Sequence, residues 1–163
     1  MNLKTLLNAV AQAIHDDQDI QSWAAVRYSR RHKVYIGLDS RNPPGETDCP
    51  LVTVFPMGKV AGMELDSMEH DLGVTCVLFD DEEKVVTRDN LVVMESMGNL
   101  LDFYDLVRLA VIGLTASGES LADLDLNVMD LEIDTIEAFP YITASVEFKF
   151  DHEYYQGESD YFD

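Results

Sequence analysis

The hydrophobic period of the chain changes several times along its length, and these changes constrain the fold more than any other feature. Apolar residues recur every three or four positions over residues 3–14, which predicts an amphipathic helix. A second helix is expected over residues 20–29, with Asp19 as its N-cap and Trp23 in the core. From Lys33 the period falls to two, the period of a β-strand. The chain therefore begins with helices and continues into a sheet.

Further strands are expected wherever alternation or a short apolar run appears between polar or proline-rich stretches. They are predicted over residues 34–38, 51–57 and 72–79, and as a hairpin in which 84–87 pairs with 91–94. The near-continuous apolar run at 51–57 indicates burial on both faces. Residues 39–50 are expected to form an ordered loop or arm, and residues 58–66 a mobile connection with little core content.

The helical period returns in one long segment. It runs from Leu100 to Leu114 and is expected to end near residues 117–118. Its apolar residues spread wider than one stripe, so the helix should pack on a sheet and touch a second element. In the last third, the inward parity switches around Met129, which predicts a β-bulge or short turn before a final strand over residues 142–150.

These segments predict the α+β class with a single domain. We expect a mixed or mostly antiparallel sheet, packed against the N-terminal helices and one long central helix. The domain is expected to span residues 1–151 and to be followed by an acidic, aromatic tail over residues 152–163. A length of 163 residues suits one domain, and 47% apolar or aromatic residues suffice for a core.

The net charge excludes one class of partner. Against 11 Lys and Arg stand 31 Asp and Glu, which gives a formal charge of −20. Nucleic-acid affinity comes mainly from cationic side chains that displace counterions from phosphates, so a phosphate-binding surface is not expected. The charge also exceeds the roughly 2–8 units that keep a small domain in solution. Its size therefore favours a functional role for the repulsion.

No arrangement of residues indicates catalysis or a metal, and we expect no enzyme activity, cofactor or metal site. The two cysteines and four histidines lie in no metal-ligand or nucleophile spacing. Residues 123–134 imitate a calcium loop, but Val128 stands where that loop needs glycine, and an alternating strand explains the same letters. His70, between Glu69 and Asp71, is expected on the exposed face of a strand. No apolar run approaches a membrane span, so we expect a protein of a reducing cytoplasm that binds no membrane.

Positive and negative charges are separated along the chain. Residues 101–163 hold fifteen acids against Arg108 and Lys149. Complementary patches of this kind suit a head-to-tail contact between identical subunits, although a basic helix end without a partner explains the cluster equally well. The predicted interface cations fall within fifteen residues and are Arg27, Arg30, Arg31, Lys33 and Arg41.

The order of segments resembles the tail terminator and tail-completion proteins of long-tailed bacteriophages and prophages. The resemblance covers most of the chain as pattern and short phrases. Its features are a helical N-terminus through Arg30 and Arg31, the strand phrase 34–39, the loop phrases 42–46 and 48–50, the long helix from Leu100, and a closing strand pair joined by residues 137–141.

The resemblance implies a structural protein of the virion, assembled in the host cytoplasm. Such proteins form a ring, usually a hexamer, that caps the tail tube, stops its polymerisation and faces the neck. The implied partners are copies of the chain itself, the tail tube protein and a neck or head-completion protein. DNA would pass through the ring without specific binding, because carboxylates repel phosphates.

Two further groups of contact residues are predicted for such a ring. Asp130, Glu132 and Asp134 are expected to face the lumen. The loop around Pro43, Pro44 and Gly45 and the connection 58–66 are expected to be contact arms that become ordered on assembly.

An alternative is an acidic mimic of DNA that inhibits a host DNA-binding protein, because spaced carboxylates can occupy a phosphate-binding groove. The cationic cluster weighs against this interpretation, since a phosphate mimic gains nothing from positive charge. An enzyme with scattered catalytic residues ranks third.

Overall fold

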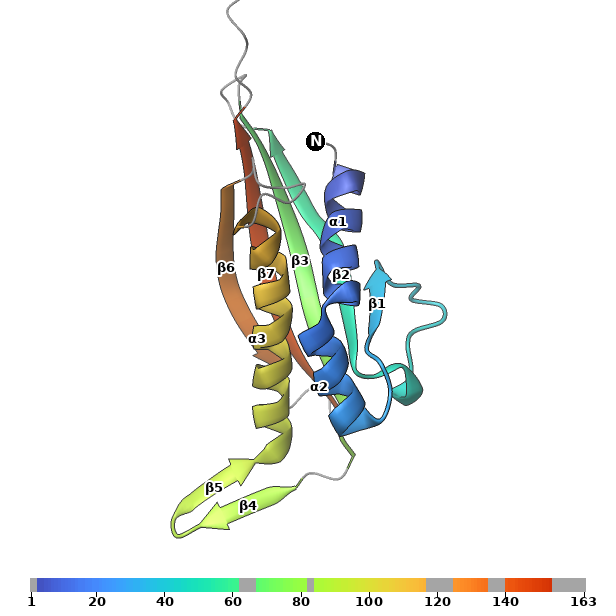
Figure 1. Ribbon diagram of the computed structural model, residues 1–163, viewed down its shortest axis with the longest axis vertical. Coiled ribbons are helices and arrows are strands. Elements are labelled where there is room, and N and C mark those ends of the chain that lie inside the picture. The colour runs from blue at the N-terminus through green and yellow to red at the C-terminus, as the bar shows by residue number, and fades with distance from the viewer. Residues whose placement is uncertain (1–2, 62–66, 82–83, 117–124, 135–139, 154–163) are drawn as a thin grey trace, which may run out of the picture.

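The computed structural model describes residues 3–61, 67–81, 84–116, 125–134 and 140–153. Helices and strands share one domain, so the predicted α+β class is confirmed (Figure 1). The elements, in chain order, are α1 (Leu3–Asp16), α2 (Gln18–Tyr28), β1 (Lys33–Ile36), the short 3-10 helix η1 (Glu46–Asp48), β2 (Leu51–Ala61), β3 (Ser67–Phe79), β4 (Val85–Arg88), β5 (Leu91–Met94), α3 (Glu95–Ala116), β6 (Asp125–Asp134) and β7 (Tyr141–Glu153).

Five strands form one mixed sheet in the order β1-β2-β3-β7-β6. β1 and β2 are parallel, whereas the other neighbours in this sheet are antiparallel. The register of β6 against β7 shifts between Val128 and Leu131, which confirms the bulge expected near Met129. β4 and β5 form a separate two-stranded sheet beyond one end of the large sheet (Figure 1).

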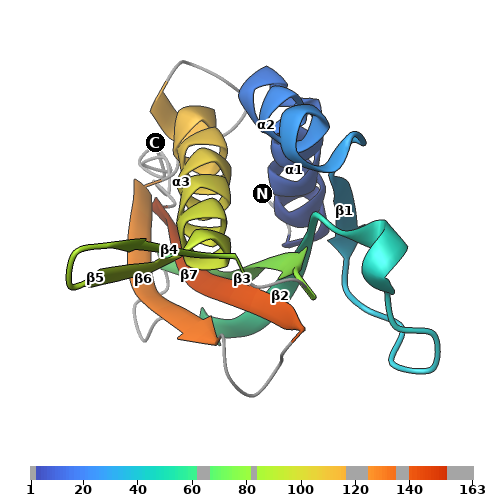
Figure 2. The ribbon, with the colours of Figure 1, turned by 90° about the horizontal axis from the view of Figure 1, so that it is seen from below.

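The helices lie together on one face of the large sheet (Figure 2). Alternation along the strands explains the arrangement, because every second residue points to the same face. Most even-numbered residues in the described parts of β2, β3 and β7 are apolar and pack beneath α1 and α3. The buried members are Val52, Val54, Leu72, Val74, Cys76, Leu78, Ile142, Ala144, Val146, Phe148 and Phe150.

The N-terminal helices pack onto this layer through apolar side chains. α1 buries Leu6, Val10 and Ile14, as the helical period predicts. In α2, the Trp23 ring stacks on Phe103 of α3 with 4.9 Å between ring centroids, which confirms its place in the core. The N-cap is Asp17 and not the predicted Asp19.

The Asp17 carboxylate accepts hydrogen bonds from the backbone N–H groups of Asp19 and Ile20, at 3.0 and 2.9 Å. Helix α2 begins two residues earlier than expected because α1 ends at Asp16, so Asp17 supplies the only residue between the two helices. Asp19 lies inside the first turn instead.

Further predicted boundaries differ from the structure, and β3, predicted over residues 72–79, begins at Ser67. Residues 58–61 continue β2 and pair with β3, so the prediction of a mobile connection there is wrong, while residues 62–66 lie outside the described part. Helix α3 begins at Glu95 because β5 leads into it directly. β7 runs to Glu153, two residues past the predicted domain boundary, and the predicted tail from residue 154 onward lies outside the described residues.

His70 is buried with 4% of its surface exposed, so its predicted place on an exposed face is wrong. It has the same parity as Leu72, Val74 and Cys76 along β3, and that parity faces the helices. The alternation of this strand, extended by one step, would have placed His70 correctly.

Candidate functional site

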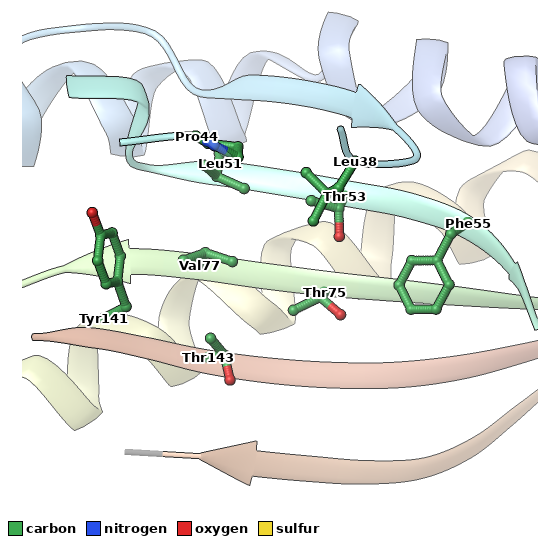
Figure 3. A pocket seen from close by; sticks show the side chains of 9 residues that line it. All are labelled: Leu38, Pro44, Leu51, Thr53, Phe55, Thr75, Val77, Tyr141 and Thr143. Atoms are coloured by element: carbon green, nitrogen blue, oxygen red, sulfur yellow. The ribbon is translucent and has the colours of Figure 1, made fainter. Parts of the chain in front are cut away.

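The second face of the large sheet carries no helix among the described elements (Figure 2). Odd-numbered residues of β2, β3 and β7 form this open face near the start of β2, where apolar side chains alternate with threonines; farther along the sheet the same face carries charged residues such as Asp71, Glu147 and Lys149. Over the apolar side chains and threonines lies a hollow of about 420 Å³ (Figure 3). It is lined by Leu38, Pro44, Leu51, Thr53, Phe55, Thr75, Val77, Tyr141 and Thr143. We call this feature the open-face hollow.

The floor of the hollow is packed at one end and accessible at the other. Leu51 and Thr53 are 3% and 2% exposed, because the loop that carries Leu38 and Pro44 borders them. Phe55 lies across Gly73 of β3, where an added Cβ would sit 2.5 Å from the aromatic ring. The absence of a side chain at residue 73 therefore lets the ring lie close to the strand.

The loop over residues 39–50, which we call the proline-rich loop, forms one rim of the hollow through Pro44. The backbone N–H of Gly45 donates to the Asp48 carboxylate at 2.8 Å, which closes η1. Pro44 is half-buried and lines the hollow, whereas Pro43 is exposed. Whether the loop becomes ordered on assembly, as predicted for a contact arm, stays a prediction.

The β4–β5 hairpin is the most exposed apolar part of the described structure. All residues of both strands are exposed. The exposed fractions range from 37% to 61%, for Val85, Val86, Leu91, Val92, Val93 and Met94. Monomeric proteins rarely expose a contiguous apolar patch of more than a few hundred Å² unless it binds something. The hairpin is therefore a candidate interaction surface.

Both faces of the hairpin are apolar. Directly opposite residues of an antiparallel pair share a face. Val86 lies opposite Val93 and Arg88 lies opposite Leu91 on one face. The other face pairs Val85 with Met94 and Thr87 with Val92. The sequence predicted the hairpin but not its exposure, although the consecutive apolar residues at 85–86 and 91–94 break the alternation of a strand with one buried face.

Four of the five predicted interface cations have partners within their own chain. The Arg27 guanidinium lies 4.8 Å from the centre of the Trp23 ring and donates to Asn99 and Asp102 of α3, at 3.0 and 3.2 Å. Arg30 donates to the Thr47 carbonyl oxygen at 2.8 Å. These two side chains fasten α2 to α3 and to the proline-rich loop.

The other three predicted interface cations differ in the contacts that they make. Lys33 forms an ion pair with Asp48, whose pKa this hydrogen bond lowers, and Arg41 pairs with Asp39 at 3.0 Å. Arg31 is exposed and makes no hydrogen bond or ion pair with the residues that the structure describes. Four members of the cluster thus make contacts within their own chain, and their predicted role in a subunit interface stays a prediction.

The predicted lumen acids lie on or beside β6. Glu132 pairs in register with Ser145 and Asp134 with Thr143, while Asp130 falls within the register shift. Their side chains lie outside the described part of the structure. The alternating strand that we expected in place of a calcium loop is confirmed for Asp125–Asp134.

The side chains that could perform chemistry are buried or scattered. Burial raises the pKa of the Cys49 thiol to about 11 and also raises the pKa of Cys76, so both thiols stay protonated at neutral pH and are poor nucleophiles. Within the described residues, no group of three or more His, Cys, Asp or Glu could hold a metal ion. No helix among the described elements is long and apolar enough to cross a membrane.

Comparison with known proteins adds no name. No protein-family model matches the chain, and no curated protein matches it significantly.

Proposed function

We propose that the protein is a structural subunit that assembles with copies of itself into a ring, and that this ring is a tail terminator of a long-tailed bacteriophage or prophage. The observation that carries the proposal is an apolar hairpin, exposed on both faces, that projects from an otherwise packed domain. The sequence resemblance supplies the place in the virion. Assembly and docking, and no catalytic turnover, are the chemistry of this function.

The positions of the two candidate surfaces support a ring. The hairpin lies near α3 and β6, whereas the proline-rich loop beside the hollow lies beyond β1 on the other side of the molecule (Figure 2). A contact between different surfaces of identical subunits is head-to-tail, and a head-to-tail contact closes into a ring when the rotation permits. Surfaces on opposite sides of the subunit are what such a contact requires.

The charge supports a ring through which DNA passes. A subunit with a formal charge of −20 repels phosphates and leaves the passing duplex unbound. Asp130, Glu132 and Asp134 remain the acids that we propose for the lumen. The proposed partners are the tail tube protein below the ring and a neck or head-completion protein above it.

The proposal is tested by sedimentation velocity and by negative-stain imaging of the purified protein, with and without tail tubes. We expect concentration-dependent rings that sit on tube ends and limit tube length. A compact monomer at all concentrations, which binds a host DNA-binding protein in competition with DNA, would instead establish the acidic mimic of DNA.

A further inference from the structure

We propose that the β4–β5 hairpin of one subunit docks into the open-face hollow of the next copy. This inference rests on the proposed ring and names the two surfaces that meet in it. It assigns a partner to both unusual apolar features of the described structure.

The hairpin needs a partner for its own stability. A two-stranded hairpin with no hydrophobic layer against it is marginally stable in water. Here the chain's own body provides no such layer, since every residue of both strands is exposed. The outer edges of β4 and β5 also carry unpaired backbone groups, which invite contact with another chain.

The hairpin cannot reach the hollow of its own chain. β5 passes into α3 without an intervening residue, and the Glu95 N–H donates to the Lys84 carbonyl oxygen at 3.0 Å, which ties the base of the hairpin to the helix. Helix α3 packs on the covered face of the sheet, whereas the hollow lies on the open face (Figures 2 and 3). A β4–β5 hairpin that occupies the hollow must therefore belong to a second copy.

The surfaces match in chemistry. The hollow is lined by aliphatic, aromatic and threonine side chains, and Leu38 at its rim is 58% exposed. One hairpin face presents Val86, Leu91 and Val93, whose aliphatic groups would lose contact with water there. A hollow of about 420 Å³ is large enough to accept several such side chains.

The charges match as well. Residues 84–94 contain Lys84 and Arg88 against Asp89, so the hairpin is net positive on a strongly negative chain. Exposed Glu46 belongs to η1 beside the hollow. Asp80, whose N–H donates to the Pro140 carbonyl oxygen, lies at the same end of the sheet, because Leu51 at the start of β2 pairs with Val77 near the end of β3. Arg30, also near η1, is engaged by the Thr47 carbonyl oxygen. Acidic groups thus lie at one end of the site that receives a cationic hairpin.

The small contact area of one hairpin favours a ring over a dimer. A stable interface buries about 800 Å² per partner, and one small hairpin provides only part of that area. In a ring, every subunit donates one hairpin and accepts another, so each subunit is held by two such contacts.

The test compares three double variants with the same added charge. Leu91→Glu/Val93→Glu places two carboxylates on the hairpin face proposed to dock, and Leu38→Glu/Thr143→Glu places two in the hollow. Val26→Glu/Leu109→Glu is the matched control, because these residues are 81% and 56% exposed on α2 and α3. Circular dichroism and thermal unfolding confirm that each variant is folded.

We expect the hairpin and hollow variants to raise the concentration for half-assembly at least tenfold, while the control assembles as the wild type does. Mixing the two defective variants should give a one-to-one dimer and no ring. In that mixture, the hairpin variant still offers an intact hollow and the hollow variant still offers an intact hairpin.

Each other outcome contradicts the inference in a distinguishable way. Normal rings of a folded hairpin variant would leave the ring proposal standing and overturn the docking. So would a mixture of the two defective variants that stays monomeric. A wild-type protein that never assembles would overturn both proposals.

Discussion

The two faces of the five-stranded sheet are made by the same strands but are covered differently. On the helix-covered face, side chains such as Val74 and Phe148 are fully buried in an apolar layer. On the open face, Thr75, Val77 and Thr143 are only half-buried around a hollow. Alternation in a strand always supplies two surfaces. The difference teaches that alternation creates two faces, whereas the described helices cover only one of them.

The largest expected effect comes from truncating one phenylalanine on each face and comparing the two losses in the free energy of unfolding. Phe148→Ala should lower the free energy of unfolding by about 3–5 kcal/mol, because it leaves a cavity in a fully buried site. Phe55→Ala on the open face should cost well under half as much in the monomer, since its ring is only half-buried. Urea unfolding measures both values. Equal losses would show that the open face is covered within one chain.

A second test concerns His32, which is buried beside the end of α1. His32 is 5% exposed, and its Nε2 lies 2.9 Å from the Ile14 carbonyl oxygen. Burial lowers its pKa below the usual 6.5, and the nearby His15 and Arg31 lower it further, against the opposing effects of the Ile14 hydrogen bond and Asp17. The unfolded chain therefore binds this proton more readily than the folded chain does.

The stability that His32 contributes should be fully present above about pH 6.5 and be lost as the pH falls toward the lowered pKa. One proton gives at most about 1.4 kcal/mol per pH unit. Urea unfolding at pH 7.5 and at pH 5.5 should show a smaller loss for His32→Gln than for the wild type. Parallel losses in the two proteins would remove His32 as a cause.

A third test distinguishes the observed helix cap from the predicted one. Asp17→Ala should lower the free energy of unfolding by about 1 kcal/mol, because two N–H groups of α2 lose their acceptor. Asp17→Asn keeps an acceptor and should restore most of that loss. Asp19→Ala is the matched control with a smaller expected effect. Thermal unfolding measures all three, and a larger loss for Asp19→Ala would contradict the cap.

The smallest effect is expected where cations were predicted to form an interface. Arg27→Ala should cost about 0.5–1 kcal/mol, because the guanidinium leaves the Trp23 ring and Asp102 at a partly exposed site. Arg31→Ala should leave the stability of the monomer unchanged within error. Chemical unfolding of the monomer checks this pair, and sedimentation of the same proteins shows whether Arg31 contributes to assembly. Equal destabilisation by both would mean that Arg31 is also engaged within its chain.

The elements themselves followed from local pattern. The stripe of α1, the alternation of β3 and β7, and the bulge in β6 are repeated features of consecutive residues, and backbone geometry converts such repeats directly into helix and strand. Boundaries were less accurate where composition gave no period. Residues 58–61 and 95–99 belong to a strand and a helix only because neighbouring elements extend through them.

The candidate surfaces were only partly predictable. Clustering along the sequence suggested a basic patch, but Arg27 reaches Asp102, a residue 75 positions away, and is engaged within its own chain. The open-face hollow combines loop residues with residues of β2, β3 and β7, so no single stretch of the sequence predicts it.

The sequence by itself determined the α+β class, the two amphipathic surfaces of the strands and the excess of negative charge. Only the tertiary structure decided which sheet face the helices cover and that the β4–β5 hairpin stands clear of the core. The physical reason is that periodicity depends on neighbours in sequence, whereas burial depends on what the rest of the chain can reach and cover.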